Sequence, residues 1–134
     1  MLKTRIRIFI LWTGIIVAAG CATPSGPLAT LPMTSPVAST YNLEGIKLFN
    51  HGQWEEARVE FERAVQADSN LAEAHFNLAL SLHKLGRHDE ARREFKIAGE
   101  LAPMSKQIVE ASVYRNHLGL SSTLERHISG GYRY

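Results

Sequence analysis

The chain has 134 residues, of which 45% are hydrophobic and 21% are charged. These values are ordinary for a globular protein, and the length leaves room for one domain. Three of the 15 basic residues (Lys3, Arg5 and Arg7) lie at the N-terminus, so 12 remain against 13 acidic residues. The rest of the chain therefore lacks the basic excess of a nucleic-acid-binding domain. The single cysteine, Cys21, excludes an intramolecular disulfide.

The first 20 residues have the properties of an export signal. Residues 1–7 carry positive charge and no acid, and a mostly apolar run follows over residues 8–19. That run is shorter than the ~20 apolar residues of a membrane-spanning helix. A short apolar core after a basic start is typical of a secretory signal, so we expect residues 1–20 to be a cleaved leader. The alternative is an uncleaved anchor in which Cys21 has no role.

The end of this segment resembles the lipobox of bacterial lipoproteins. Val17, two alanines and Gly20 lead directly to Cys21, although Ala18 stands where leucine is commoner. The resemblance implies that the leader is cut before Cys21 and that acyl chains such as palmitate on this residue anchor the protein to a membrane of the cell envelope. Ala22 follows the cysteine instead of aspartate. In a Gram-negative host this implies the outer membrane, with the protein facing the periplasm.

A proline-rich stretch separates the cysteine from the rest of the chain. Residues 22–38 contain four of the five prolines among Ser, Thr, Gly and Ala, without helical or strand periodicity. This composition is typical of a semi-extended linker. We therefore predict that residues 21–38 are the lipid anchor and a disordered linker that holds the folded part off the membrane. A proline-rich ligand for another protein is the alternative.

An internal repeat with an offset of 34 residues occupies the centre of the chain. Residues 52–64 and 86–98 share Gly, Glu, Ala, Arg, Glu, Phe and Ala at matching places. A period of this length is typical of stacked helical hairpins. Gly52 and Gly86 stand where a left-handed residue would end the first helix of each hairpin. The repeat therefore predicts two similar hairpins.

These repeats resemble the tetratricopeptide-repeat (TPR) family. Ala57 and Ala91 stand at its small packing positions and Pro103 at the close of the second unit, whereas Ser69 replaces the closing proline of the first. The resemblance implies an all-α fold of two antiparallel TPR helical hairpins and a C-terminal capping helix. We expect helices over residues 40–51, 53–68, 71–85, 88–101 and 105–118, stopped by Gly119. The TPR domain would span 39–120, with repeats at about 38–71 and 72–105, a cap at 105–119 and a tail at 121–134.

In the TPR family, the first helices of successive hairpins line a concave groove for an extended peptide or a partner's helix. The asparagines there can bond a ligand backbone as donor and acceptor, and the phenylalanines can serve as apolar anchors. Asn77 and Lys84 are expected on an open face that does not support the core. The alternative for Ile46 and Phe76 is packing under the cap. The resemblance implies these groove residues: Asn42, Ile46, Phe49, Asn50, Glu73, Phe76, Asn77, Leu80, His83 and Lys84.

No catalytic residue, cofactor site or metal site is predicted. The six histidines include no pair at i, i+4 and no His-Glu-x-x-His pattern. The chain also lacks a recognisable nucleophile elbow and a glycine-rich phosphate loop. We therefore expect a protein that binds and does not catalyse.

The combined interpretation is an envelope lipoprotein that acts as a protein-binding scaffold or adaptor in assembling an envelope, secretion or pilus complex. Its partners would be a protein and, through the anchor, a membrane, but not nucleic acid. One alternative is a self-oligomerising structural lipoprotein whose groove is filled by its own linker or another copy. The other is a non-catalytic subunit of an envelope enzyme. Because such arrays usually need about three repeats, dimerisation and completion by a partner stay open, and the oligomeric state is not predicted.

Overall fold

The computed structural model describes residues 26–31 and 34–120. Within these ranges the chain is all-helical, as predicted, and none of the helices is long and apolar enough to cross a bilayer. The predicted leader, Cys21 and the tail at 121–134 lie outside the described residues. The helices are α1 (Pro36–Asn50), α2 (Trp54–Ala67), α3 (Ala72–Lys84), α4 (His88–Leu101), α5 (Lys106–Val109) and α6 (Ser112–His117).

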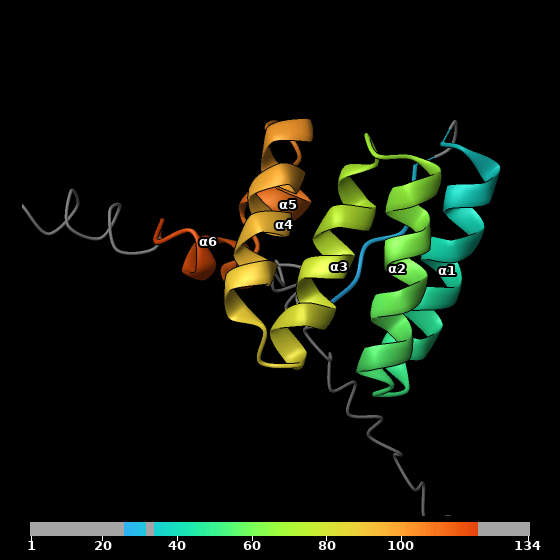
Figure 1. Ribbon diagram of the computed structural model, residues 1–134. Helices are drawn as coiled ribbons and strands as arrows, with labels where there is room; N and C mark the ends of the chain where they lie inside the picture. The colour runs from blue at the N-terminus through green and yellow to red at the C-terminus, as the bar shows by residue number, and fades with distance from the viewer. Residues whose placement is uncertain (1–25, 32–33, 121–134) are drawn as a thin grey trace, which may run out of the picture.

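The four long helices form two antiparallel hairpins, α1 with α2 and α3 with α4, and α2 packs beside α3 (Figure 1). Gly52 and Gly86 follow α1 and α3 with φ angles of 78° and 77°. Glycine adopts this left-handed conformation without the steric penalty that a Cβ atom brings. The same turn therefore recurs 34 residues apart, which confirms the hairpins that the repeat predicted.

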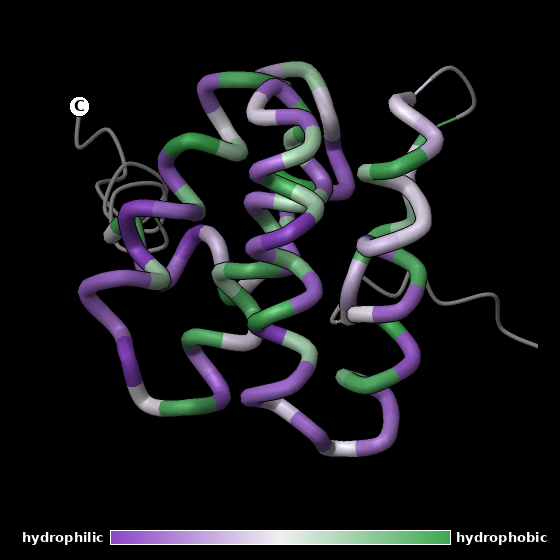
Figure 2. The backbone as a smooth tube through the Cα atoms, turned by 45° about the vertical axis from the view of Figure 1, so that its right-hand side comes forward, coloured by the Kyte–Doolittle hydropathy of each residue, from purple (hydrophilic) through white to green (hydrophobic). Residues whose placement is uncertain are grey.

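The core lies where the helices face one another. Figure 2 shows hydrophobic and hydrophilic residues alternating around the helical turns, as in amphipathic helices. Ala57 and Ala91 are fully buried, so the two small repeat positions do lie inside. Small residues there leave room for large side chains at the helix crossings. The largest fully buried apolar side chains are Phe61, Phe76, Phe95 and Ile108.

Two predicted boundaries are wrong. The first helix begins at Pro36 and not near residue 40, because proline fits the first turn, where its missing N–H has no partner to lose. The cap is two short helices and not one, because Ala111 is extended, with φ −60° and ψ 127°. Ile108 and Tyr114, six residues apart, would face different sides of a continuous helix. The break at Ala111 accompanies burial of both side chains.

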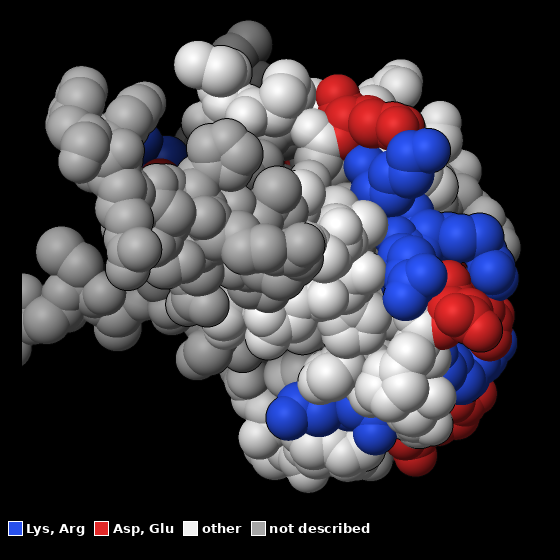
Figure 3. Space-filling model, turned by 90° about the vertical axis from the view of Figure 1, so that its left-hand side faces the viewer, with Lys and Arg blue, Asp and Glu red and all other residues white. Residues whose placement is uncertain are grey.

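The outer surface carries charges of both signs. In Figure 3, Lys and Arg side chains are interspersed with Asp and Glu along one margin of the molecule. Arg58 pairs with Glu55 and Glu62 on α2, and Arg87 pairs with Glu90 at the start of α4. Pairs exposed to solvent contribute at most about 1 kcal/mol each. Packing and turn geometry, and not these pairs, therefore account for the fold.

A close approach of α1 to α2 gives a stability prediction. A Cβ atom at Gly45 would lie 2.6 Å from the ring of Phe61, which is fully buried. Alanine favours helix by roughly 1 kcal/mol over glycine, but the buried ring cannot move aside. We expect Gly45→Ala to lower the free energy of unfolding by about 1–2 kcal/mol, measured by urea denaturation of the full chain in mild detergent.

Lys47→Ala, on the exposed side of the same helix, is the matched control and should change the free energy of unfolding by less than ~0.5 kcal/mol. A Gly45→Ala protein that equals or exceeds the wild type in stability would contradict the close packing of α1 on α2.

Candidate functional site

The predicted groove between α1 and α3 holds part of the same chain. Residues 26–31, here called the linker segment and coloured blue in Figure 1, run alongside these helices. The Leu28 side chain is only 7% exposed and belongs to the main hydrophobic cluster. Over these six residues, the prediction of a disordered spacer is wrong. The helix surfaces bury Leu28 and bind its backbone, and composition alone does not reveal either contact.

Asn42 and Asn77, here called the asparagine clamp, hold the backbone of Leu28. The Leu28 N–H donates to Oδ1 of Asn77 at 2.6 Å. The Leu28 carbonyl accepts from Nδ2 of Asn77 at 2.7 Å and from Nδ2 of Asn42 at 3.0 Å. A further bond, 2.8 Å long, joins Nδ2 of Asn77 to Oδ1 of Asn42. Because both asparagines are fully buried, these bonds replace bonds to water.

The asparagine clamp binds atoms that nearly every residue possesses. Its partners are one backbone N–H and one carbonyl, so the side chain at that position is not constrained by these bonds. Proline alone lacks the N–H that Asn77 accepts. The geometry therefore suits a peptide backbone, and the hydrophobic cluster around Leu28 adds a preference for an apolar side chain.

The aromatic residues predicted in the groove belong to the core. Phe76 is fully buried, and its ring meets Phe95 edge to face at a centroid distance of 5.4 Å. Phe49 is 6% exposed, and its ring lies 4.7 Å from that of Trp54. Leu80 is also buried. These side chains support the groove from below, and a direct ligand contact for them stays a prediction.

The polar members of the predicted groove do not form one open face. Asn77 is fully buried, whereas Lys84 is exposed, with its Nζ 5.6 Å from the centre of the Trp54 ring. The expectation that Asn77 does not support the core is therefore wrong. Of the remaining predicted groove residues, Asn50 is exposed, and Ile46, Glu73 and His83 are partly buried.

His75 on α3 joins α4 to the connection between α2 and α3. Its Nδ1–H donates to the Glu94 carboxylate at 2.7 Å, and its Nε2–H donates to the Ser69 carbonyl at 3.1 Å. Burial lowers the pKa of His75, but the hydrogen bonds to Glu94 and Ser69 outweigh it, so the pKa is raised. With an acceptor at each nitrogen, the ring is held by two hydrogen bonds that favour its protonated form. His75 and Glu94 are 19 positions apart on different helices, so their spacing along the chain does not indicate this contact.

Three other histidines meet at one end of the second hairpin. His83 lies in the last turn of α3, His88 begins α4 and His117 ends α6. Their ring centroids are 4.9, 5.4 and 5.6 Å apart in the three pairs. Their spacing along the chain gives no sign of this cluster. The turn at Gly86 and the packing of the cap bring them together.

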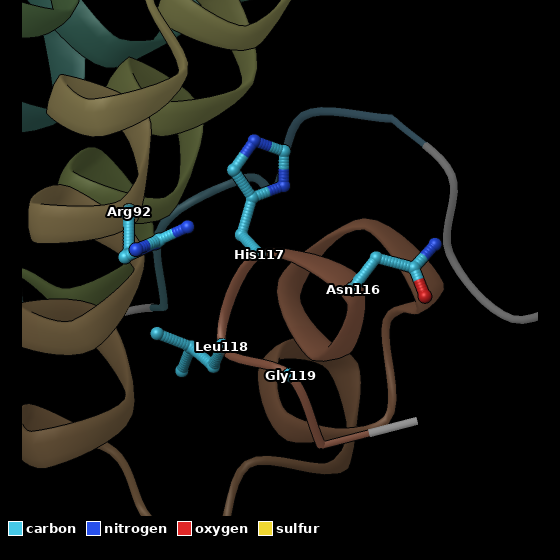
Figure 4. A pocket seen from close by; sticks show the side chains of 5 residues that line it. All are labelled: Arg92, Asn116, His117, Leu118 and Gly119. Carbon is cyan, nitrogen blue, oxygen red and sulfur yellow. The ribbon is translucent and has the colours of Figure 1, made fainter. Parts of the chain in front are cut away.

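A hollow of about 300 Å³ adjoins this cluster. Figure 4 shows the five residues that line it: Arg92 from α4, Asn116 and His117 from α6, and Leu118 and Gly119, which follow α6. Burial, followed by the nearby His117, His88 and Lys84, lowers the pKa of His83. The pKa of His83 is thus shifted in the opposite direction to the pKa of His75.

Comparisons with known proteins place repeats over the two hairpins. A family model described as TPR repeat matches residues 45–86, and one described as Tetratricopeptide repeat matches residues 72–105. Protein O-mannosyl-transferase Tmtc3 of Drosophila melanogaster is 34% identical over 85 residues, which are 62% of this chain but 9% of that protein. Uncharacterized protein MJ0572 of Methanocaldococcus jannaschii is 38% identical over 58 residues, 43% of this chain and 67% of that protein. The chain thus spans less than a tenth of the transferase.

The His75–Glu94 pair predicts a pH dependence of stability. Because the pKa of His75 is higher in the folded state than its ordinary value of 6.5, protonation of this ring stabilises the fold. That stabilisation is complete below pH 6.5 and is lost as the pH rises through the pKa of the folded state. The difference in unfolding free energy between wild type and His75→Gln should therefore be larger near about pH 6 than near about pH 8. Glu94→Gln keeps the ring, removes the carboxylate and should reduce the same pH dependence. Chemical denaturation at both pH values measures the unfolding free energies. A difference between wild type and His75→Gln that grows with pH would contradict the ion pair.

Proposed function

Because residues 45–105 are tetratricopeptide repeats, we propose that this chain is a protein-binding scaffold or adaptor whose groove takes an extended segment of a partner protein. Repeats of stacked helical hairpins build concave surfaces that serve for binding. The observation that carries the proposal is the asparagine clamp, which already holds a peptide backbone at Leu28. Binding without catalysis accounts for this arrangement, so the proposed function includes no enzymatic step.

The contacts of Leu28 define the segment that the groove would accept. One residue of the partner would present its N–H and carbonyl to the asparagine clamp and its side chain to the hydrophobic cluster. That residue would be aliphatic and not proline. Its neighbours are less constrained, since Ala29 and Leu31 are exposed in the linker segment. The partner would thus contribute a short backbone stretch with one buried aliphatic side chain.

A partner would have to displace the linker segment. Burial of a leucine side chain stabilises a complex by roughly 1.5–3 kcal/mol, and each hydrogen bond adds about 0.5–1.5 kcal/mol. The linker segment makes both kinds of contact, so it competes for the groove and lowers a partner's apparent affinity. The proposed adaptor is therefore self-occupied at rest, and binding is an exchange of one peptide for another.

We also propose that Cys21 is lipidated and anchors the protein in the cell envelope, at the outer membrane facing the periplasm if the host is Gram-negative. The small residues at 17–20 and Ala22 support this. With the linker segment seated, four residues (22–25) separate Cys21 from the groove. When the segment is displaced, 14 residues (22–35) separate Cys21 from α1. At up to about 3.6 Å per residue, partner binding would lengthen the tether. Such a tether suits an adaptor in the assembly of an envelope, secretion or pilus complex.

The seated linker segment also favours a second candidate, a structural lipoprotein whose groove is permanently filled by its own chain. The two candidates differ in whether an added peptide can enter the groove. The adaptor requires that the linker segment be exchangeable, whereas the structural protein requires that it stay in place.

The exchange can be measured with a labelled peptide that copies residues 24–33. In wild type, the attached linker segment competes with it. Leu28→Asp should expel the linker segment, because a carboxylate is costly to bury, and should raise affinity for the added peptide about tenfold or more. Leu31→Asp is the matched control, because Leu31 is 68% exposed, and should bind like wild type. Fluorescence anisotropy on full-length proteins, with circular dichroism to confirm folding, gives the affinities.

If folded Leu28→Asp and Leu31→Asp bind the peptide equally, Leu28 does not control access to the groove. No binding to any form would exclude the exchangeable groove and favour the structural protein.

Lipidation is tested by metabolic labelling with palmitate in a bacterial host. The wild-type chain should incorporate the label and lose its leader, whereas Cys21→Ser should remain an unlabelled precursor, because the acceptor thiol is gone. Thr23→Ala, two residues further on, should be labelled like wild type. A wild-type chain that takes up no palmitate would show that Cys21 is not an anchor.

A further inference from the structure

His83, His88 and His117, here called the histidine cluster, offer three nitrogen ligands from three different helices. One ring nitrogen from each residue lies within 4.8 Å of the other two. Three imidazoles at this separation repel one another when protonated, whereas neutral imidazoles direct lone pairs into a shared space. Neutral imidazole is a common ligand of zinc, copper, nickel and iron.

The hydrogen bonds of the cluster leave ligand atoms available. The Nδ1 atom of His83 is buried and has no hydrogen-bond partner among the described residues. A buried polar atom in this state is normally satisfied by a partner, a water molecule or an ion. The Nδ1–H of His117 donates to the Val113 carbonyl at 3.0 Å. That bond places the lone pair on Nε2, as the outer hydrogen bonds of metal-binding histidines do.

From this juxtaposition we propose that His83, His88 and His117 form a binding site for a divalent first-row transition-metal ion, with Zn²⁺ as the model ion. Zinc binds imidazole nitrogen at about 2.0–2.1 Å, which places tetrahedral ligand atoms about 3.3 Å apart. The ligand nitrogens, which lie within 4.8 Å of one another, therefore need to close in by up to roughly 1.5 Å. His88 is exposed at the first position of α4 and can rotate without disturbing the core.

The neighbours of the cluster define the kind of site. Three histidines leave a fourth position for water or an outside ligand, as in open zinc sites. Arg92 lines the hollow beside His117, and Lys84 acts electrostatically on His83. These cations oppose a bound dication, so we expect moderate affinity. The bound ion would join α6 to the turn between α3 and α4 and so fix the cap on the second hairpin.

The test is a titration of the full-length chain, without an affinity tag and in mild detergent, with Co²⁺ and then Zn²⁺. A Cys21→Ser background removes the thiol as a competing ligand. One Co²⁺ per chain should bind with a visible d–d absorption, Zn²⁺ should displace it, and Zn²⁺ should raise the melting temperature. His88→Gln and His117→Gln should each weaken Co²⁺ binding by about tenfold or more and abolish the thermal shift.

His51→Gln is the matched control, because His51 is an exposed histidine at the end of α1, outside the cluster. It should leave Co²⁺ binding unchanged. His117 packs against Phe95, so its variant can lose stability for another reason. His88 is exposed, so a loss of metal binding in His88→Gln cannot be attributed to a disturbed core. If no ion binds, the site does not exist. If His88→Gln and His51→Gln weaken binding equally, the histidines bind metal only as separate surface groups, and the site is overturned.

Discussion

Two buried amides, those of Asn42 and Asn77, impose the central constraint on this structure. Their single mutual bond leaves donor and acceptor capacity that the helices do not satisfy. An unsatisfied buried polar group costs about 1–3 kcal/mol. The backbone of Leu28 supplies both a donor and an acceptor, so the linker segment satisfies the pair. A dry and empty groove is therefore unfavourable, and the groove holds the linker segment, a partner peptide or water.

The linker segment and the cap cover apolar surface of the two repeats that a third repeat would otherwise bury. A stack of two hairpins exposes apolar surface at its end and along its concave side. Ile108 and Tyr114 of the cap cover the end, where Tyr114 meets the ring of Phe95 at 6.0 Å between centroids. Leu28 covers the concave side. Segments outside the repeats thus replace the burial that a third repeat would supply.

The predictions from sequence succeeded where a local pattern carries the structure. The 34-residue period and the glycines at 52 and 86 specify two hairpins, because helical turns and chain reversals depend on neighbouring residues. The groove prediction named both asparagines of the clamp but expected Asn77 on an open face. It named the chain's own linker as one alternative occupant of the groove but did not identify Leu28, because Leu28 and Asn77 are 49 positions apart and follow no common period.

The cap was predicted as one helix and not two, and the histidine cluster was missed, for related reasons. A single helix over residues 105–118 agrees with local propensity, but packing of both Ile108 and Tyr114 required a break at Ala111. The cluster joins positions 83 and 88, across a turn, to position 117 on the cap. Once the path of the cap was wrong, the proximity of His117 could not be predicted.

All three polar arrangements converge on α3, in which ten of 13 residues are buried. This helix supplies Asn77 to the linker segment, His75 to Glu94 and His83 to the histidine cluster. A substitution in α3 therefore changes the core together with the interaction under study. Each arrangement also has a partner outside α3: Leu28 lies in the linker segment, Glu94 on α4 is partly exposed, and His88 is exposed. Substituting Leu28, Glu94 or His88 therefore tests one polar arrangement at a time, because each of these residues belongs to one arrangement alone.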